Sequence, residues 1–488
     1  MQDRTINPTP KVAKTWREKA TAYNVELHYW KRKYKDTDQS CRRYKAQSKQ
    51  LREELRIAHR QNAELLKERG VKFDPGQAVK SHSYRANEIR LFLHLRELGM
   101  CSLRGCARVV MVLSVVIGLE IKTPSASTIR RWENKMGYGQ IHRSGPPSGS
   151  YALIVDEGAN LGGQKVLLLL GVNLEHYRFE RPLRIEDVEI LSVCVRKSWK
   201  AKDIKACIEE VIKRGFVIDY GCSDEGSNIV KALRDSDIDR FSDCTHALGK
   251  LLEKCYKTDE TFLKFTAETT RIKRQLCMSR HDAYSPPHRR DKARFLNLEA
   301  LSKWANLMLF KVLTQQGIEQ EEIYQKLGWL NEMRDFVEEL GRKVELNNRI
   351  MKILKHRGMC KKTYRRAVGM VCKSEVEPSY KTAVLEYLTT NYELLGSRRR
   401  AICTSDVIES VFGKLKNTTS SNVQVGLSEG VLRVANYGHD YDEQQVKQTM
   451  ESVHIKDLKE WRENNLVQTA AQRKKQLQSL GKNGARAA

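Results

Sequence analysis

The chain has 488 residues, of which 40% are hydrophobic and 30% are charged, and it carries a formal net charge of +27 at pH 7. This length is too great for one ordinary core, so we expect about three or four domains. The surplus charge indicates a polyanionic partner, most commonly nucleic acid, and the alternative is a basic surface kept for solubility. No apolar stretch approaches the ~20 residues that span a bilayer, so we expect no membrane-spanning segment and no membrane partner.

Cysteine usage bears on the compartment. None of the twelve cysteines forms a C-x-x-C pair, so neither a zinc framework nor a dense disulfide scaffold is predicted. Because the chain starts without a secretory signal, we expect reduced cysteines in a cytoplasmic, nucleoid-associated protein. The apolar run Val109–Leu119 is too short to cross a membrane and is predicted to be a buried core helix.

Residues 1–69 have the pattern of one long polar helix with an apolar seam. The seam steps by three and four through Leu27, Trp30, Tyr34, Thr37, Cys41, Tyr44, Ser48, Leu51, Leu55, Ala58, Asn62 and Leu65. This 3.5-residue period predicts a left-handed coiled coil that joins a homodimer or a higher homo-oligomer. The alternative is an amphipathic helix that folds back on its own chain.

Residues 84–137 are predicted to form three helices of a helix-turn-helix unit. The first covers Asn87–Leu98, and the second runs from Ser102 to about Ile117. Thr123 and Pro124 suit the N-cap and first position of the third, which we expect to end at Met136. The Gly-, Pro- and Ser-rich stretch 137–150 is predicted to be a linker.

The third helix has two contrasting faces. Ala126, Ile129, Trp132 and Met136 share an apolar face that would be buried. The residues off that face are Ser127, Arg130, Arg131, Asn134 and Lys135. A basic, hydrogen-bonding face of this kind suits a recognition helix in the major groove of double-stranded DNA. The alternative is a three-helix unit with no DNA partner.

From residue 151 onwards, apolar strand patterns alternate with helical ones. One apolar run climbs to Val155 and stops on Asp156, two more strands follow, and after a helix a fourth strand ends on Asp224. Another helix, a strand and a helix complete the order of a ribonuclease-H-like mixed sheet. Its first and fourth strands lie side by side, so Asp156 and Asp224 would meet. Two carboxylates that close repel, which argues for Mg²⁺ or Mn²⁺ between them.

Six segments together resemble a protein family. They read YALIVDEGANLGGQKVLLLLGVNL, RPLRIEDVEILSV, SDEGSNIVKAL, DCTHALGKLLEK, TSDVIESVFGKLKN and, upstream, TPSASTIRRWENKMG, and they span residues 84–417. Their order and spacing resemble a bacterial insertion-sequence DDE transposase, with a ribonuclease-H-like core and a helical insertion before the last acid. The resemblance implies that Asp156, Asp224 and Glu409 are the catalytic and metal-binding acids. Asp243 and His246 match its supporting D-x-x-H element.

The chemistry of such a site agrees with these residue types. Two metal ions that stabilise the attacking and leaving oxygens of a phosphodiester need several carboxylate oxygens, so the expected cofactor is two Mg²⁺ ions, with Mn²⁺ possible. Glu409 would lie early in a helix capped by Ser405 or Asp406, with Phe412 and Gly413 toward the sheet. Two lysines beyond them are expected to contact phosphates, namely Lys414 and Lys416.

Each acid has rivals in the sequence. Glu225 or Asp243 could take the role of Asp224, and Asp406 could take that of Glu409. Glu157 is expected to be a solvated neighbour of the site, and Asp156 could simply terminate a strand.

The predicted fold class is an α/β core with a large all-α insertion, an N-terminal coiled coil and a helix-turn-helix unit. The core would consist of residues 151–256 and 401–466, the insertion of 257–400 and a basic tail of 467–488. The expected function is that of a transposase that binds its element's ends and target DNA and catalyses cleavage and strand transfer. The alternatives are a structure-specific nuclease and a non-catalytic dimeric DNA-binding regulator.

Overall fold

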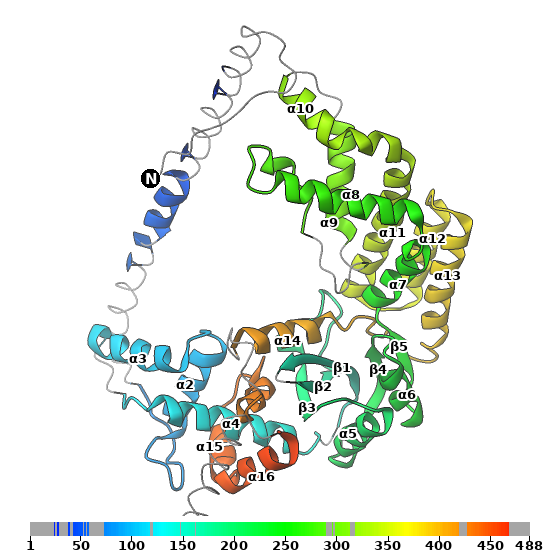
Figure 1. Ribbon diagram of the computed structural model, residues 1–488. Coiled ribbons are helices and arrows are strands. Elements are labelled where there is room, and N and C mark those ends of the chain that lie inside the picture. Colours follow the sequence, from blue (N-terminus) through cyan, green and yellow to red (C-terminus); the bar gives the residue numbers. More distant parts are fainter. Residues whose placement is uncertain are drawn as a thin grey trace, which may run out of the picture. The chain divides into compact units, whose positions relative to one another are not determined.

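The computed structural model describes residues 73–117, 121–146, 148–161, 163–288, 298–312, 318–418 and 427–467, with position 295 and short stretches between 24 and 57 (Figure 1). It has two compact units. One comprises residues 1–73, 260–289 and 300–338, and the other comprises 74–259, 290–299 and 339–488. The predicted insertion is therefore divided between the units.

The predicted coiled-coil seam lies largely outside the described residues. Residues 42–51 are helical, and on them Tyr44 and Leu51 are 73% and 56% exposed. Exposed apolar side chains on a helix are compatible with a partner helix, and the coiled coil stays a prediction.

The first unit is helical and has an aromatic core. Its helices are α8 (Glu260–Leu276), most of α9 (Leu298–Leu307), α10 (Ile318–Leu327) and the first turn of α11 (Arg334–Arg357), with a 3-10 segment, η4 (Gly328–Met333). The Phe265 ring lies 6.0 Å from Trp329 and 5.4 Å from Phe336. Ring pairs at such distances stabilise a core beyond the area they bury.

The second unit contains a mixed five-stranded sheet (Figure 1). Its strands are β1 (Tyr151–Leu161), β2 (Gln164–Asn173), β3 (Glu189–Arg196), β4 (Ile218–Ser223) and β5 (Arg240–Ser242), in the order β3-β2-β1-β4-β5. β1 pairs antiparallel with β2 and parallel with β4, and β4 pairs parallel with β5. The predicted pairing of the first and fourth strands is confirmed.

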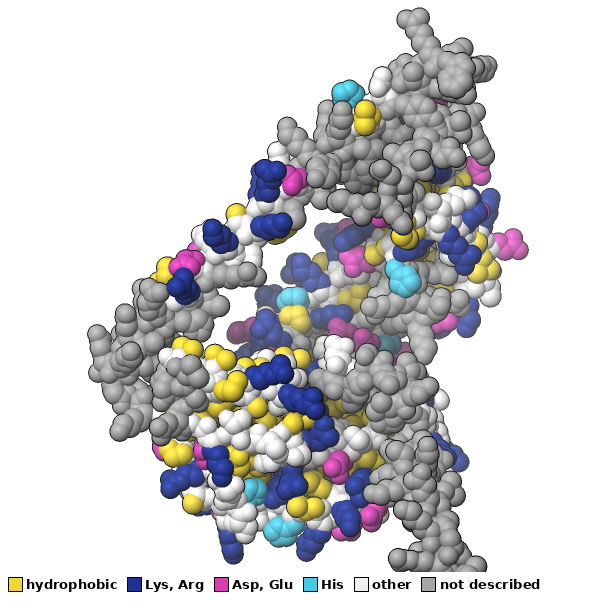
Figure 2. All heavy atoms as spheres, turned by 60° about the vertical axis from the view of Figure 1, so that its left-hand side comes forward, with side chains coloured by type: hydrophobic (Ala, Val, Ile, Leu, Met, Phe, Trp, Pro, Cys, Tyr) yellow, Lys and Arg dark blue, Asp and Glu magenta, His cyan; other side chains and the backbone are white. Residues whose placement is uncertain are grey.

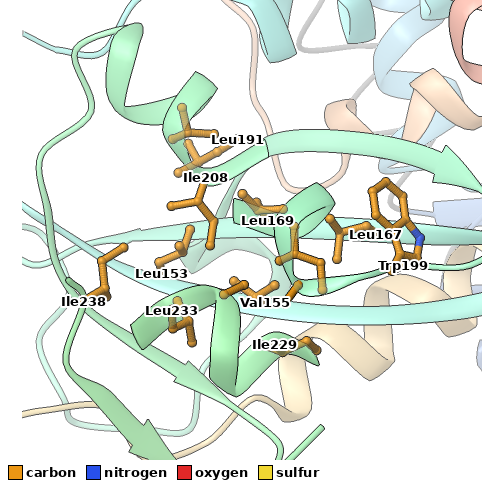
Figure 3. Close-up of a cluster of buried hydrophobic side chains, with 14 of the residues drawn as sticks. Leu153, Val155, Leu167, Leu169, Leu191, Trp199, Ile208, Ile229, Leu233 and Ile238 are labelled. Carbon is orange, nitrogen blue, oxygen red and sulfur yellow. The ribbon is translucent and has the colours of Figure 1, made fainter. Parts of the chain in front are cut away.

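One face of the sheet is covered by α5 (Ala201–Lys213) and α6 (Ser227–Asp235) (Figure 3). Leu153 and Val155 are two positions apart on β1, so both side chains point to this face. Ile204 and Ile208 lie one turn apart on α5 and meet the same core. Burial of these apolar side chains, at about 1.5–3 kcal/mol each, holds the strand ends in register.

The predicted three-helix unit is present as α2 (Ala86–Glu97), α3 (Leu103–Ile117) and α4 (Ala126–His142), but its limits differ from those expected. Ser125, rather than Thr123, caps α4, because its hydroxyl accepts a hydrogen bond from the Thr128 N–H. The helix also continues past Met136 into the segment predicted to be a linker.

Two glycines explain that continuation. A Cβ on Gly137 would lie 2.0 Å from the carbonyl oxygen of Leu432, and one on Gly139 would lie 2.6 Å from Thr449. These glycines therefore permit close packing between α4 and the C-terminal segments rather than marking a turn. The segments involved are η5 (Glu429–Asn436), α15 (Glu443–Ser452) and α16 (Ile455–Asn465).

The apolar run on α3 is only partly buried, so the expected core helix is wrong in part. Cys106 and Val110 are buried, whereas Met111, Val112 and Val116 are 54–65% exposed.

Hydrophobic side chains are visible on the face shown in Figure 2, where basic side chains are more widespread than acidic ones. Among the described residues, no helix is long and apolar enough to cross a membrane.

The remaining helices of the second unit are α7 (Cys244–Tyr256), the rest of α11, α12 (Lys361–Lys373), α13 (Pro378–Glu393) and α14 (Asp406–Thr418). Asn347 on α11 donates to the Leu248 carbonyl on α7, and Tyr380 on α13 donates to Asn347. A bridge between Met359 and Ala401 precedes α14 and returns the chain toward the sheet.

Candidate active site

Asp156 lies within β1 and not at its end. The strand continues past Val155 and pairs Asp156 with Leu168 and Glu157 with Leu167, so the expected end of the strand is wrong. β4, on the other side of β1, stops at Ser223, the register partner of Val155. Asp156 is thus the first β1 residue beyond the last paired residue of β4, where the sheet leaves that edge open.

Asp224 follows β4 directly and lies beside Asp156. Because Val155 and Ser223 are register partners in parallel strands, the residues after them are adjacent at the ~4.8 Å spacing of neighbouring strands. The Gly226 N–H donates to the Asp224 carboxylate at 2.9 Å, which forms a tight turn into α6. The meeting predicted for these two acids is therefore present in the backbone register.

The electrostatics of the pair are unfavourable for two carboxylates. Burial, and then the negative charge of Asp224, raise the pKa of Asp156 to about 7. The Glu157 N–H donates to Asp156 at 2.7 Å and His246 is close enough to act in the opposite direction, but neither offsets the shift. Without a cation, Asp156 is thus a carboxyl group that resists ionisation near neutral pH.

α14 brings Glu409 to the same edge of the sheet. Phe412 is buried against β1 at Gly158, where a Cβ would lie 2.8 Å from the ring. Glu409 lies one turn before Phe412, and its charge contributes to the raised pKa of Asp156. Gly413 faces open space among the described residues rather than the sheet, contrary to expectation. Gly158 was not singled out in the sequence, although a glycine inside a strand pattern signals close approach.

Asp243 and His246 form a buried support between the sheet and α14. Asp243 caps α7 and is 1% exposed. One of its oxygens accepts from the His246 N–H at 2.7 Å and from the ring Nδ1 at 3.0 Å, and the other accepts from the Ser405 N–H and hydroxyl. Burial pushes the pKa of Asp243 upward, but the hydrogen bonds from His246 and Ser405 outweigh it and lower the pKa.

His246 is a cation that lies beside the acids. Its Nε2 lies 3.9 Å from the Glu409 carboxylate, and its other nitrogen contacts Asp243. The hydrogen bond to Asp243 raises the pKa of His246 to about 9, against an opposing effect of burial. The charges of Asp224 and Glu409 add to this rise, so the ring is protonated at neutral pH.

Of the rival acids, Asp406 and Glu225 are engaged elsewhere, and so is Glu157, which is half-buried and not the solvated neighbour that was expected. The Asp406 carboxylate lies 2.6 Å from Lys355 and accepts from Thr245. Glu225 pairs with Lys250 at 2.9 Å, and Glu157 pairs with Lys165 at 2.8 Å. These ion pairs favour Asp224 and Glu409 as the acids that remain for a ligand.

The donor set is of the type that a hard divalent cation prefers, since it consists of carboxyl oxygens. Within the described part of the chain, however, no three Asp, Glu, His or Cys side chains converge closely enough to hold a metal ion. Glu409 is 62% exposed on its side chain and is the member that would have to turn inward.

The predicted recognition face of α4 is only partly exposed. Ser127, Arg130 and Arg131 are exposed, and neither arginine forms an ion pair with a described residue. Asn134 and Lys135 are 2% and 6% exposed, so they are not part of an exposed face.

The burial of Lys135 has a local cause. Its ammonium group donates to the Met450 carbonyl on α15 at 2.8 Å, and burial lowers its pKa. α15 covers this side of α4, which the sequence of the helix alone does not reveal.

The two lysines expected to contact phosphates differ from each other. Lys416 is exposed. Lys414 is 15% exposed, lies 3.2 Å from the buried carboxylate of Glu97 and stands 4.2 Å from the centre of the Tyr437 ring. Arg433 lies 3.7 Å from the same carboxylate. Lys414 therefore joins α14 to α2 through a buried ion-pair cluster and is not open to DNA.

No model of a protein family matches this chain, and no curated protein matches it. Among solved structures, it is similar to a chain of the Drosophila P element transposase strand transfer complex, with 12% sequence identity. The match covers 79% of this chain and 99% of that chain, with a TM-score of 0.41. A similarity this loose assigns neither a family nor an activity.

Proposed function

We propose that the protein is a metal-dependent polynucleotidyl transferase with a ribonuclease-H-like core, and specifically a DNA transposase. The observation that carries the proposal is the edge at β1 and β4, where Asp156 and Asp224 are neighbours and α14 supplies Glu409. The net charge of +27 and the exposed arginines of α4 support DNA as the substrate.

In this proposal the three acids hold two Mg²⁺ ions, with Mn²⁺ as a substitute. When bound, such ions stabilise the attacking and leaving oxygens of a phosphodiester. Asp156, held by β1 beside Asp224, would give up its proton as a bound cation compensates its charge. His246 keeps Asp243 ionised, and Asp243 in turn fixes the Ser405 end of α14.

Ser127, Arg130 and Arg131 would bind the ends of the mobile element, with base edges read by whichever arginine enters the groove. The seam in residues 1–69 would pair two subunits and thereby raise the local concentration of the second end. Lys416 is the remaining lysine of α14 that could contact a phosphate near the acids.

The test is an end-cleavage and joining assay with the full-length protein, Mg²⁺, duplex DNA carrying the ends that flank its gene, and a target plasmid. We expect cleavage and joining by the wild type, and loss of both in Asp156→Asn, Asp224→Asn and Glu409→Gln with DNA binding retained. Glu225→Gln, which alters a nearby acid paired with Lys250, is the matched control and should stay active. Cleavage without joining would favour a nuclease, and full activity in any of the three variants would remove that acid from the site.

A further inference from the structure

A basic groove lies between α11 and α12 in the second unit, and the proposed active site makes no use of it. It encloses a hollow of about 550 Å³. Two arginines of α11 and two basic residues of α12 line it, namely Arg342, Arg349, Arg366 and Lys373. Leu346 and Met370 add an apolar contribution to the lining, and Glu345 and Glu375 add the acidic one. Basic side chains outnumber acidic ones, so the groove carries net positive charge.

Part of this positive charge is not compensated by the protein itself. Arg366 and Lys373 are exposed, and neither forms an ion pair with a described residue. Arg349 approaches Glu345 only at 4.0 Å, with both side chains more than half exposed. Exposed pairs of this kind contribute little to stability and are readily exchanged for another anion.

Gly369 leaves the backbone of α12 open on the groove side. It lies in the interior of α12, where glycine is less favourable than alanine, and it lines the groove between Arg366 and Lys373. A Cβ at this position would meet no described atom within 4 Å, so packing within the chain does not require glycine here. A glycine on an open helix face allows an external group to approach the backbone closely.

The spacing of the basic residues fits an extended anion better than a single one. Arg342 and Arg349 lie two turns apart on α11, which is about 10 Å along the axis, and Arg366 and Lys373 have the same spacing on α12. Two pairs with this spacing suit an elongated ligand better than a single point charge. A strand of duplex DNA presents a phosphate about every 3.4 Å of its axis, so such rows match several successive phosphates.

We propose that the α11–α12 groove, defined by Arg342, Arg349, Arg366, Gly369 and Lys373, binds the phosphodiester backbone of duplex DNA. This surface is distinct from the recognition face of α4 and from the three acids. The choice of DNA as the polyanion rests on the proposed function, whereas the charge and the open glycine do not.

The test measures binding of a random-sequence duplex to the full-length protein by fluorescence anisotropy at several salt concentrations, with EDTA present so that cleavage plays no part. The Arg366→Gln, Lys373→Gln double variant should lower the slope of log K against log salt by about 2, since each lost phosphate contact contributes about 0.9. The matched control is the Lys361→Gln, Arg365→Gln double variant, which makes the same charge change on exposed α12 residues outside the groove lining. Its slope should equal that of the wild type.

Gly369 variants provide a second readout. Gly369→Ala should raise the midpoint of urea unfolding, and Gly369→Glu should weaken DNA binding without lowering that midpoint. Equal slopes in the wild type and the groove variant would overturn the proposal. A second result would also overturn it. If inorganic phosphate raises the melting temperature of the wild type but not of the groove variant, and the DNA slope of the variant is unchanged, the groove holds a single small anion. Either failure leaves end cleavage by the wild type unaffected, so it is distinguishable from failure of the proposed function.

Discussion

Two carboxylate clusters in the second unit differ in the charges that surround them, and one is buried while the other is half-buried. Glu97, the last residue of α2, is buried with two fixed cations beside it, Lys414 of α14 at 3.2 Å and Arg433 at 3.7 Å. Asp156 lies beside another carboxylate, Asp224, and His246 is the cation whose field reaches it. Burial raises the pKa of both Glu97 and Asp156, and the arginine and the lysine reduce the rise at Glu97 without cancelling it.

The difference separates a structural ion-pair cluster from a binding site. A buried carboxylate beside a lysine and an arginine already has cations fixed by the fold, and removing one partner leaves the others uncompensated. A carboxylate pair without such partners stores electrostatic repulsion that a mobile cation relieves. We therefore expect a metal ion at the Asp156 cluster, and we expect the Glu97 cluster to hold α2 and α14 together.

The largest effect should come from breaking the structural cluster. Glu97→Ala leaves Lys414 and Arg433 buried without their carboxylate, so we expect a loss of about 3–5 kcal/mol in the free energy of unfolding. Urea unfolding followed by circular dichroism measures it. Glu463→Ala, at a glutamate with a 67% exposed side chain, is the control and should change stability by less than about 0.5 kcal/mol. A loss at Glu97 no greater than that of the control would contradict a compensated structural role.

At Asp156 we expect a substitution to increase the free energy of unfolding. Asp156→Asn removes a charge that the fold disfavours and keeps an oxygen to accept from the Glu157 N–H. At pH 8 without metal, the variant should be more stable than the wild type by about 1–4 kcal/mol. Urea unfolding in EDTA measures the difference, and a destabilised variant would mean that the Asp156 charge is already compensated.

The pH dependence of stability follows from the raised pKa of Asp156. The pKa of Asp156 is raised from 3.8 to about 7, so between these values the folded state binds more protons than the unfolded state. The stability of the wild type relative to Asp156→Asn should therefore fall as pH rises from about 4 to about 7 and level off above it. A difference that stays flat over this range would show that Asp156 does not titrate as described.

A smaller effect is expected at His246. Its pKa is raised from 6.5 to about 9, so its charge contributes stability that is fully present below pH 6.5 and is lost as pH rises through 9. Relative to His246→Gln, the wild type should lose about 1–2 kcal/mol over that range. Thermal or urea unfolding at several pH values measures it, and an unchanged difference would remove the imidazolium from the acid cluster.

The sheet was the most predictable part of the fold. Its apolar runs and their order led to the pairing of β1 with β4 and to the meeting of Asp156 with Asp224. The local pattern did not give the end of β1, because pairing with β2 carries the strand through two charged residues and Gly158. Tertiary pairing here overrides the local preference of the residues.

The helical region was less predictable because its contacts are remote in sequence. Gly137 and Gly139 have the composition of a linker, yet they are helical because segments near Leu432 and Thr449 pack closely on them. Lys135 resembles an exposed basic residue until α15 is placed over it. The sequence pattern of one helix contains no information about a second helix, some 300 positions away, that packs over it.

The most direct test of the central claim is diffraction from crystals of the full-length protein soaked in Mn²⁺, with anomalous scattering used to locate the metal. We predict a Mn²⁺ peak between the carboxylates of Asp156 and Asp224, with Glu409 turned inward to join them, and no peak at Glu97. The peak should vanish in Asp156→Asn. Mn²⁺ absent from the wild-type acids, or bound at Glu97 instead, would contradict the account.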